Sequence, residues 1–427
     1  MRIVPPTRRA TLGGLGGALG AAALAGCGRT RPPGELSLWA MGNEAASLPE
    51  LLPDFARAHP GIGVRLQPLP WSAAHEKLLT GFAGGSLPDV TQIGNTWLAE
   101  LVAIGALAPL PDAERGLLED QFPAVLDANT IGGRAWGVPW YVDTRLQFYR
   151  RDLLARAGFE APPARWDAWK AMLQRVRRVA GAGNYAILLP VNEFEPLLTL
   201  ALSQPEPLLR EDGTRGNFSS AGFRETLAFY KSLFDEQLAP VIANTQISNV
   251  WTEFARGFFS VYLSGPWTVG DMKARLPAAM QRDWATAPMP GPDGPGAAAP
   301  GGSSLVVTAG ARDPAAAWAL VRWLSRPAVQ ARFNALTGDL PARTSAWGLT
   351  DIAADPRLAA FGTQLQHARA VPKVPEWERI VTEMQVVAER CVRGELGVVA
   401  ACAEIDRRAD RLLEKRRWML DKGRAEA

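Results

Sequence analysis

Two short polar segments lie where predicted strands end. Asn43 and Glu44 follow a strand predicted over 35–40, and Asn95 with Thr96 follows a strand predicted over 88–93. In open α/β sheets, ligands bind beyond the carboxyl ends of the strands. Carboxylates accept hydrogen bonds and amides both donate and accept them, so these side chains suit a ligand that carries hydroxyl groups. Two alternatives need no ligand: a solvated acid at a helix N-terminus for Glu44, and a plain N-cap for Asn95.

The sequence lacks the familiar motifs of catalysis. There is no GxSxG nucleophile elbow and no Walker lysine motif. His75-Glu76 is followed by Leu79 where a zinc-protease helix would carry its second histidine. The chain has only three histidines, which argues against a His-rich metal site. We expect no catalytic residue, no metal and no cofactor.

The candidate residues sit within a regular alternation of elements. Helices are predicted over 48–59, 72–83 and 97–104, and strands over 35–40, 63–69 and 88–93. We expect a polar turn over 41–44. This rhythm predicts an α/β domain with a parallel sheet. Further along, 136–149 predicts β structure that crosses between domains, 287–302 a Pro- and Gly-rich loop, and 377 onward an almost wholly helical end.

The first residues have the pattern of an export signal. Arg2, Arg8 and Arg9 precede a charge-free stretch over 10–26, which ends in Leu-Ala-Gly before Cys27. The sequence therefore predicts a signal peptide over 1–26 and a short tether over 27–33. The arginine pair also partly matches a twin-arginine signal, and the choice between that route and the general one stays open.

Charge and cysteine content narrow the protein class. Without residues 1–26, Lys+Arg falls from 46 to 43 and equals Asp+Glu at 43, so a large basic surface for nucleic acid is not expected. No other stretch is long and apolar enough to span a membrane. Cys391 and Cys402 allow either a disulfide, if Gly394 and Gly397 turn the chain back, or two buried free thiols.

Several motifs together resemble one family. The segments 84–90 (GGSLPDV), 262–267 (YLSGPW), 301–307 (GGSSLVV) and 338–343 (GDLPAR) resemble, in order and spacing, those of bacterial extracellular solute-binding proteins of family 1. Leu24-Ala25-Gly26-Cys27 resembles the lipobox of bacterial lipoproteins, whose cysteine carries the lipid. The likeness covers about residues 35–420.

The resemblance implies an architecture. It predicts an α/β fold of the type II periplasmic-binding-protein class, in which crossing hinge segments join two lobes around a ligand cleft. Lobe one would comprise 34–143 plus 300–345, and lobe two 144–299 plus 346–427. The mature protein would be a monomer outside the inner membrane, periplasmic or at the cell surface, and anchored by lipid at Cys27.

The resemblance also assigns binding roles. Trp267 matches the position that stacks on a sugar ring in this family, whereas Trp166, Trp169, Trp318 and Trp323 read as core. Relatives often carry Asp where this chain has Asn95. The remaining candidates are polar, aromatic or glycine residues near the cleft: Tyr141 and Asp143 on the crossing segment, Gly302, Arg343, Trp377, and Glu193 or Glu195 from lobe two. For Asp143 the alternative is a hinge ion pair with Arg145.

The expected function is substrate capture for an ABC sugar importer. The ligand would be a neutral di- or oligosaccharide, such as the α-glucosides maltose or trehalose, delivered by hinge closure to the transmembrane permease subunits. A glycerol-phosphate-type ligand is the runner-up. A secreted glycoside hydrolase, with two carboxylates such as Glu44 and Asp143 flanking one bond, is a further alternative, and a sensor lipoprotein feeding a receptor is another.

Overall fold

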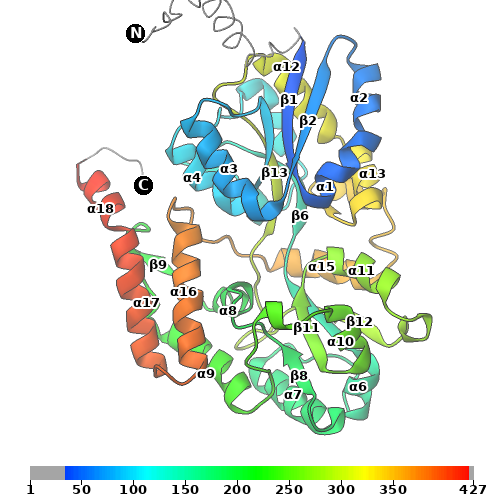
Figure 1. Ribbon diagram of the computed structural model, residues 1–427, viewed down its shortest axis with the longest axis vertical. Helices are drawn as coiled ribbons and strands as arrows, with labels where there is room; N and C mark the ends of the chain where they lie inside the picture. Colours follow the sequence, from blue (N-terminus) through cyan, green and yellow to red (C-terminus); the bar gives the residue numbers. More distant parts are fainter. Residues whose placement is uncertain (1–33, 423–427) are drawn as a thin grey trace, which may run out of the picture.

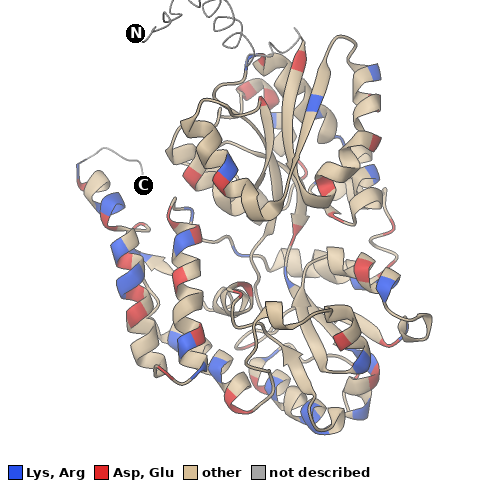
Figure 2. Ribbon diagram, in the orientation of Figure 1, with Lys and Arg blue, Asp and Glu red and all other residues tan. Residues whose placement is uncertain are grey.

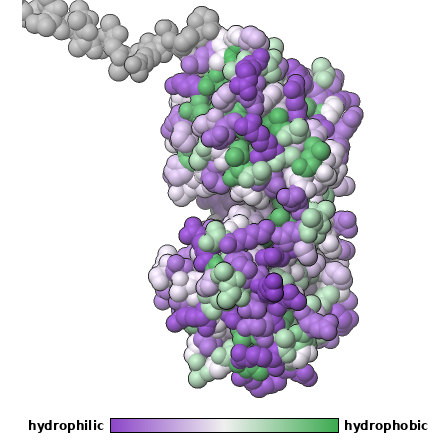
Figure 3. All heavy atoms as spheres, turned by 90° about the vertical axis from the view of Figure 1, so that its right-hand side faces the viewer, coloured by the Kyte–Doolittle hydropathy of each residue, from purple (hydrophilic) through white to green (hydrophobic). Residues whose placement is uncertain are grey.

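The computed structural model describes residues 34–422, which form two lobes stacked along the long axis (Figure 1). The leader, Cys27 and the tether predicted above lie outside the described residues. We call the part built on a six-stranded sheet lobe one and the part built on a four-stranded sheet lobe two. In a space-filling view a notch separates them (Figure 3).

Lobe one has a mixed sheet in the order β14-β6-β13-β3-β1-β2. Its strands are β1 (Glu35–Met41), β2 (Gly63–Leu69), β3 (Val90–Gly94), β6 (Val138–Asp143), β13 (Gly301–Val307) and β14 (Leu340–Pro341). Strands β1, β2 and β3 run parallel, as predicted, and β13 runs antiparallel to both β3 and β6.

Helices cover both faces of this sheet. Along β1 the side chains alternate: Leu36, Leu38 and Ala40 join one hydrophobic cluster, and Trp39 and Met41 join another. The first cluster packs against α1 (Gly42–Ser47), α2 (Leu52–Ala58), α12 (Pro314–Leu324) and α13 (Pro327–Thr337), and the second against α3 (Trp71–Ala83) and α4 (Leu98–Ala103). Smaller elements are α5 (Pro123–Ala128), α14 (Thr344–Trp347) and the hairpin of β4 (Thr130–Ile131) and β5 (Arg134–Ala135).

One local prediction in this lobe is wrong. The segment expected as a polar turn over 41–44 opens helix α1 instead, with Gly42 at a φ of 54°. Glycine adopts this left-handed conformation without a steric penalty, so the helix starts directly at the end of β1. Glu44 therefore lies in the first turn of a helix.

Lobe two has a sheet in the order β12-β7-β11-β8. Its strands are β7 (Leu146–Arg150), β8 (Tyr185–Leu188), β11 (Phe259–Ser264) and β12 (Trp284–Ala287). One face packs on α7 (Trp166–Ala180), α8 (Glu195–Ala201) and α9 (Ala221–Asp235), and the other on α10 (Val250–Arg256), α11 (Trp267–Arg275) and α15 (Pro356–Gln366). Helix α6 (Arg151–Arg156) and the hairpin of β9 (Leu209–Arg210) and β10 (Arg215–Gly216) complete it.

The predicted crossing segment does join the two sheets. Strand β6 belongs to the first sheet and β7, after Thr144 and Arg145, belongs to the second. The chain returns from β12 to β13 through the predicted Pro- and Gly-rich loop, although Gly301 and Gly302 already belong to β13. Residues at these crossings lie close to both lobes.

The C-terminal part is helical, as predicted. Helices α16 (Trp377–Val392) and α17 (Val398–Leu412) pack on the core of lobe two, followed by α18 (Glu414–Asp421). Cys391 and Cys402 are buried free thiols, one of the two alternatives above, and burial raises the pKa of Cys402 to about 12. Within 34–422 no helix has the length and apolarity that a membrane crossing requires. Positive and negative side chains interleave over both lobes (Figure 2).

Candidate functional site between the lobes

Glu44 is the centre of a hydrogen-bond cluster on lobe one. Its carboxylate is buried at the start of α1 and accepts a hydrogen bond from the Tyr141 hydroxyl on β6, with 2.5 Å between Oη and Oε1. Trp71 at the start of α3 donates its ring N–H to Oε2 at 3.4 Å. Burial and the Glu44 carboxylate raise the pKa of Tyr141 well above its usual value, so the phenol stays a donor.

Gln92 fixes this cluster to the sheet. Its Oε1 accepts the backbone N–H of Met41 at 2.7 Å, and its Nε2 donates to Glu44 Oε1 at 3.3 Å. The same Nε2 lies 3.5 Å from the Tyr141 hydroxyl. One buried amide thus ties the end of β1, the first turn of α1 and strand β6 into one network. Such a network holds the carboxylate in a single orientation.

Two further carboxyl groups lie near Glu44 at the crossing between lobes. Asp143 ends β6, and its carboxylate accepts the backbone N–H of Gly302 and pairs with Arg145 Nη1 at 3.2 Å. Burial raises the pKa of Asp143, against the opposing effect of Arg145. Burial, followed by the charges of Glu44 and Asp143, raises the pKa of Asp339 well above its usual value. These carboxyl groups offer acceptors when ionised and donors when protonated.

On lobe two, Trp267 helps to line a pocket of about 350 Å³. The side chain is 37% exposed at the start of α11, and the Arg145 guanidinium lies over its ring, 4.8 Å from the centroid. Arg145 Nη2 is also 3.9 Å from Glu195 Oε1. The pocket is lined by Arg145, Glu193, Glu195, Pro196, Thr199, Asn244, Tyr262, Leu263, Ser264 and Trp267.

A second polar contact joins the lobes farther along. Glu378, in the first turn of α16, forms a side-chain hydrogen bond with Thr96 of lobe one, and burial raises the pKa of Glu378. His75 on α3 contacts Glu100 at 2.7 Å and lies near Glu378. Asp143, Arg145 and Glu378 thus bring charged groups of both lobes to one region.

The sequence and the fold of the chain match those of known proteins. The family model for bacterial extracellular solute-binding proteins matches residues 41–331, more than half of the chain. The chain belongs to that family. Its fold is that of the type II periplasmic binding proteins, which confirms the predicted fold class and the resemblance read from the motifs.

Solved and curated relatives of this solute-binding protein match more than four fifths of its length. The sugar-binding protein MalE of Xanthomonas citri is 48% identical with a TM-score of 0.87, and the match covers 91% of this chain and 99% of that one. The GacH receptor of Streptomyces glaucescens is 24% identical with a TM-score of 0.77 over 90% and 99%. The diacetylchitobiose binding protein DasA of Streptomyces coelicolor is 23% identical over 81% of each chain.

The structure of this solute-binding protein brings several predicted site residues together. Glu44, Tyr141 and Asp143 form one cluster, which Arg145 links to Trp267. Asn43 lies exposed beside Glu44 in the first turn of α1. Asp143 makes the ion pair with Arg145 that was the alternative to a binding role, and it ends β6 at the crossing between the lobes. Glu193 and Glu195 both line the lobe-two pocket.

Asn95 and Gly302 hold the protein's own backbone together. The Asn95 amide donates to the carbonyl of Gly301 at 3.0 Å and accepts from the Ser304 hydroxyl at 2.7 Å, so it ties β3 to β13. The N-cap of the following turn is Gly94, so the N-cap alternative for Asn95 is wrong. Gly302 has a φ of 96°, and a Cβ there would lie 2.4 Å from the carbonyl oxygen of Tyr141. The close approach of β13 to β6 is by itself enough to require glycine at this position.

Arg343 and Trp377 lie outside the cluster. The Arg343 guanidinium donates to the carbonyl of Gly116 at 3.2 Å. Trp377 is 2% exposed and packs in the core of lobe two with the other apolar residues of α16. Its ring has no face open for stacking, so we drop both residues from the proposed site. The four helical tryptophans read as core are all buried, as predicted.

Sequence reasoning missed three members of the site. Gln92 is a polar residue inside a buried strand, which is an unusual place for an amide and could have marked it. Asp339 lies in the GDLPAR segment but was not singled out. Trp71 begins a helix after Pro70, and no local signal distinguishes it from an ordinary surface tryptophan.

Proposed function

We propose that this solute-binding protein captures a neutral di- or oligosaccharide between its lobes and delivers it to an ABC permease. The observation that carries the proposal is the exposed ring of Trp267, which lies in a lobe-two pocket and is joined through Arg145 to the carboxylates at the lobe crossing. An aromatic ring beside several carboxyl groups supplies both kinds of surface that a sugar needs.

The chemistry of a sugar matches these two surfaces. A sugar ring has weakly apolar C–H faces, which pack on an aromatic ring, and a rim of hydroxyl groups, which need hydrogen-bond partners. Trp267 would take a face, once Arg145 moves from its ring, and Glu44 and Asp143 would accept hydroxyl hydrogens. A buried hydroxyl left unpaired would cost roughly 1–3 kcal/mol, so the placement of these carboxylates selects among sugars.

An α-glucoside such as maltose or trehalose is the proposed ligand class. Similarity to the sugar-binding protein MalE at 48% identity supports it. A glycerol-phosphate-type ligand is less well served, since Arg145 is the one Lys or Arg side chain in the described lining of the Trp267 pocket and already pairs with Asp143. Phosphate recognition generally calls for more cationic donors than this.

Binding would be coupled to closure of the lobes. A ligand that touches Trp267 on lobe two and Glu44 on lobe one favours the closed form, because only that form makes both sets of contacts. Shifting the balance from 1:99 to 99:1 requires about 5.5 kcal/mol of differential binding. The proposed moving bodies are 34–143 plus 300–345 and 144–299 plus 346–427.

We also propose that the protein works outside the inner membrane, anchored by a lipid. Export through the leader, followed by lipid attachment at Cys27, would hold a monomer at the outer face of the inner membrane within reach of its permease. The tether over 27–33 would leave both lobes free to close. Growth with a labelled fatty acid should label the wild type and not Cys27→Ala, and equal labelling of the two proteins would reject the anchor.

Titration calorimetry with a set of ligands tests the proposal. Maltose, trehalose, sucrose and a glycerophosphodiester would each be titrated into the wild-type chain, and recovered ligand would be checked for hydrolysis. We expect one-site binding of an α-glucoside without turnover. Binding of only the glycerophosphodiester would select the runner-up, and turnover of the sugar would select the hydrolase alternative.

A further inference from the structure

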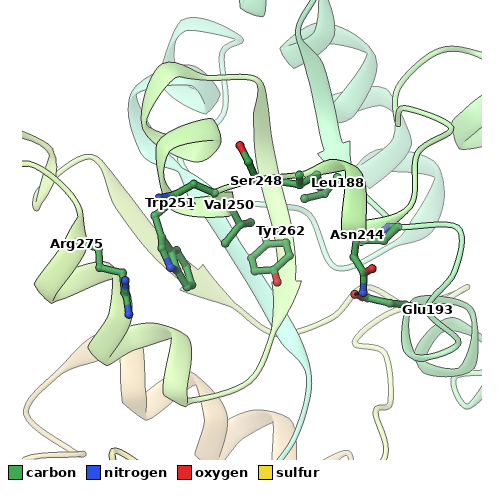
Figure 4. A pocket seen from close by; sticks show the side chains of 11 residues that line it. Leu188, Glu193, Asn244, Ser248, Val250, Trp251, Tyr262 and Arg275 are labelled. Carbon is green, nitrogen blue, oxygen red and sulfur yellow. Dashed lines mark hydrogen bonds between the residues drawn. The ribbon is translucent and has the colours of Figure 1, made fainter. Parts of the chain in front are cut away.

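One pocket in the described chain stands apart from the site above. It measures about 470 Å³ and lies between α4 and the β4–β5 hairpin of lobe one and the segment 373–376 and helix α18 of lobe two. We call it the α4–α18 pocket. It shares no lining residue with the Trp267 pocket and includes none of the Glu44 cluster. By contrast, the pocket drawn in Figure 4 shares Tyr262 and Asn244 with the Trp267 pocket and belongs to the site above.

Apolar side chains form much of the wall of the α4–α18 pocket. Lobe one contributes Val102 and Ile104 from α4 and Ile131 from the hairpin, and α18 contributes Met419. Trp136, next to the hairpin, is half-buried, and its ring N–H donates to the carbonyl of Ile131 at 3.3 Å. The volume falls within the roughly 300–1,000 Å³ typical of small-ligand sites. This wall suits a ligand with an apolar body.

The charged side chains of the same wall are mostly positive. Four cations line the pocket: Arg134, Lys373, Lys415 and Arg416. Among residues 34–422, Lys373 alone of the four has an acidic partner, Asp127 at 2.7 Å. Glu376 is the one acid in the described lining. In the pocket of Figure 4, the cation Arg275 is already paired with Asp271 at 2.8 Å. The α4–α18 pocket therefore favours an anionic group, and the Figure 4 pocket does not.

Two polar atoms of this wall are buried without a hydrogen-bond partner in the described part of the chain. They are Nε of Arg416, on α18, and Oε2 of Glu376, directly before α16. Buried donors and acceptors are normally paired, because an unpaired one destabilises the fold. A carboxylate on a ligand would accept from Arg416, and an N–H beside that carboxylate would donate to Glu376. The wall thus asks for an acceptor and a donor in one head group.

We propose that the α4–α18 pocket binds an amphiphilic carboxylate of the N-acyl amino acid class. The carboxylate bonds Arg416, and the amide N–H donates to Glu376. The acyl chain packs on Ile104, Trp136 and Met419. This second site is separate from the sugar site, and the inference does not depend on which sugar the protein captures.

Titration calorimetry with three probes tests the chemistry of the ligand. N-octanoylglycine carries the acyl chain, the amide N–H and the carboxylate. Its methyl ester lacks the charge, and undecanoate, a chain of equal length, lacks the amide. The wild type should bind N-octanoylglycine at one site and the methyl ester at least roughly tenfold more weakly, because the charge-assisted hydrogen bond is lost. Undecanoate should bind about fivefold more weakly, because Glu376 stays without a donor.

Two variants and a matched control test the place of binding. Arg416→Gln should weaken N-octanoylglycine at least about tenfold. The control Arg411→Gln removes an exposed arginine on α17, outside the lining, and should leave the affinity unchanged. Ala103 is exposed on α4 and lines the pocket, so Ala103→Trp fills it without removing core packing and should abolish binding. This second variant keeps the test decisive if Arg416→Gln misfolds.

Trp267→Ala separates this pocket from the sugar site. It should bind N-octanoylglycine as the wild type does, and loss of binding would place the probe in the sugar site and overturn the inference. The inference also falls if the wild type does not bind N-octanoylglycine, or if either comparison probe binds as tightly. Wild-type affinity in both Arg416→Gln and Ala103→Trp overturns it too. None of these results bears on sugar capture, which the sugar titrations test separately.

Discussion

The two surfaces that face each other across the lobes are built differently. On lobe one, Glu44, Tyr141 and Gln92 are buried and bonded to one another. On lobe two, Trp267 and Glu195 are each more than a third exposed, and Arg145 lies over the Trp267 ring. The difference indicates that lobe one presents a fixed set of hydrogen-bond acceptors, whereas lobe two presents a surface that rearranges when a ligand binds. Changes on lobe one should therefore alter both stability and binding, and changes on lobe two binding alone.

The largest effect on binding is expected from Trp267→Ala. Loss of a stacking ring at the centre of a site typically costs 2 kcal/mol or more, which is at least about 30-fold in affinity. The thermal midpoint should stay close to that of the wild type, because the ring is exposed. Calorimetry and thermal unfolding measure the two quantities.

The matched control for this change is Trp418→Ala, which removes an exposed ring far along the chain. It should leave affinity unchanged. If Trp267→Ala also binds the sugar as tightly as the wild type, the ring does not stack on the ligand and lobe two lacks the role assigned to it.

A smaller effect on binding, with an added loss of stability, is expected from Tyr141→Phe. The change leaves the buried Glu44 carboxylate without its shortest hydrogen bond. A buried group that loses its partner costs roughly 1–3 kcal/mol of unfolding free energy, and the freed carboxylate should bind sugar about tenfold more weakly. Urea unfolding and calorimetry give both values.

The outcome of Tyr141→Phe decides whether lobe one is the fixed surface. Weaker binding with unchanged unfolding free energy would show that the Tyr141 hydroxyl meets the ligand and does not support Glu44. Such a result would remove the contrast between the lobes.

The smallest effect is expected from Asp339→Asn, as a change in the pH dependence of stability. Burial and neighbouring carboxylates raise the pKa of Asp339, so the folded protein keeps this proton to a higher pH than the unfolded chain does. The stability from this group is present below the ordinary Asp pKa and is lost as pH rises through the raised value. As the pH rises from the ordinary Asp pKa through the raised value, the thermal midpoint of the variant should therefore fall less steeply than that of the wild type.

The Asp339→Asn variant has to be compared with the wild type, because acids with lowered pKa values make stability rise with pH instead of fall. Asp152 and Asp355, for example, have lowered pKa values beside arginine or lysine. Their contributions cancel when the variant is compared with the wild type. If the thermal midpoints of the two proteins change equally with pH, Asp339 does not interact with the buried carboxyl groups of Glu44 and Asp143.

Local sequence patterns predicted much of the frame of the site. Alternation and turn residues gave β1, β2 and β3 correctly, and the strand-end rule pointed to Glu44 before any family was considered. The aromatic crossing segment was also read correctly as β6 and β7. These features depend on residues close together in the chain, which is why a single sequence shows them.

Roles set by distant partners were not predictable in this way. Asn95 bonds Gly301 and Ser304, more than 200 residues away, so its amide could not be known to be occupied. Trp377 was misjudged for a different reason. Ile380, Val381 and Met384 follow it at helical spacing, and this pattern already places its ring on the buried face of α16.

The most direct test is a crystal structure with maltotriose bound. We predict one sugar between the lobes, with a ring stacked on Trp267, Arg145 displaced from that ring, and hydroxyl groups within hydrogen-bond distance of Glu44 and Asp143. A sugar bound elsewhere, with Arg145 still covering Trp267, would contradict it.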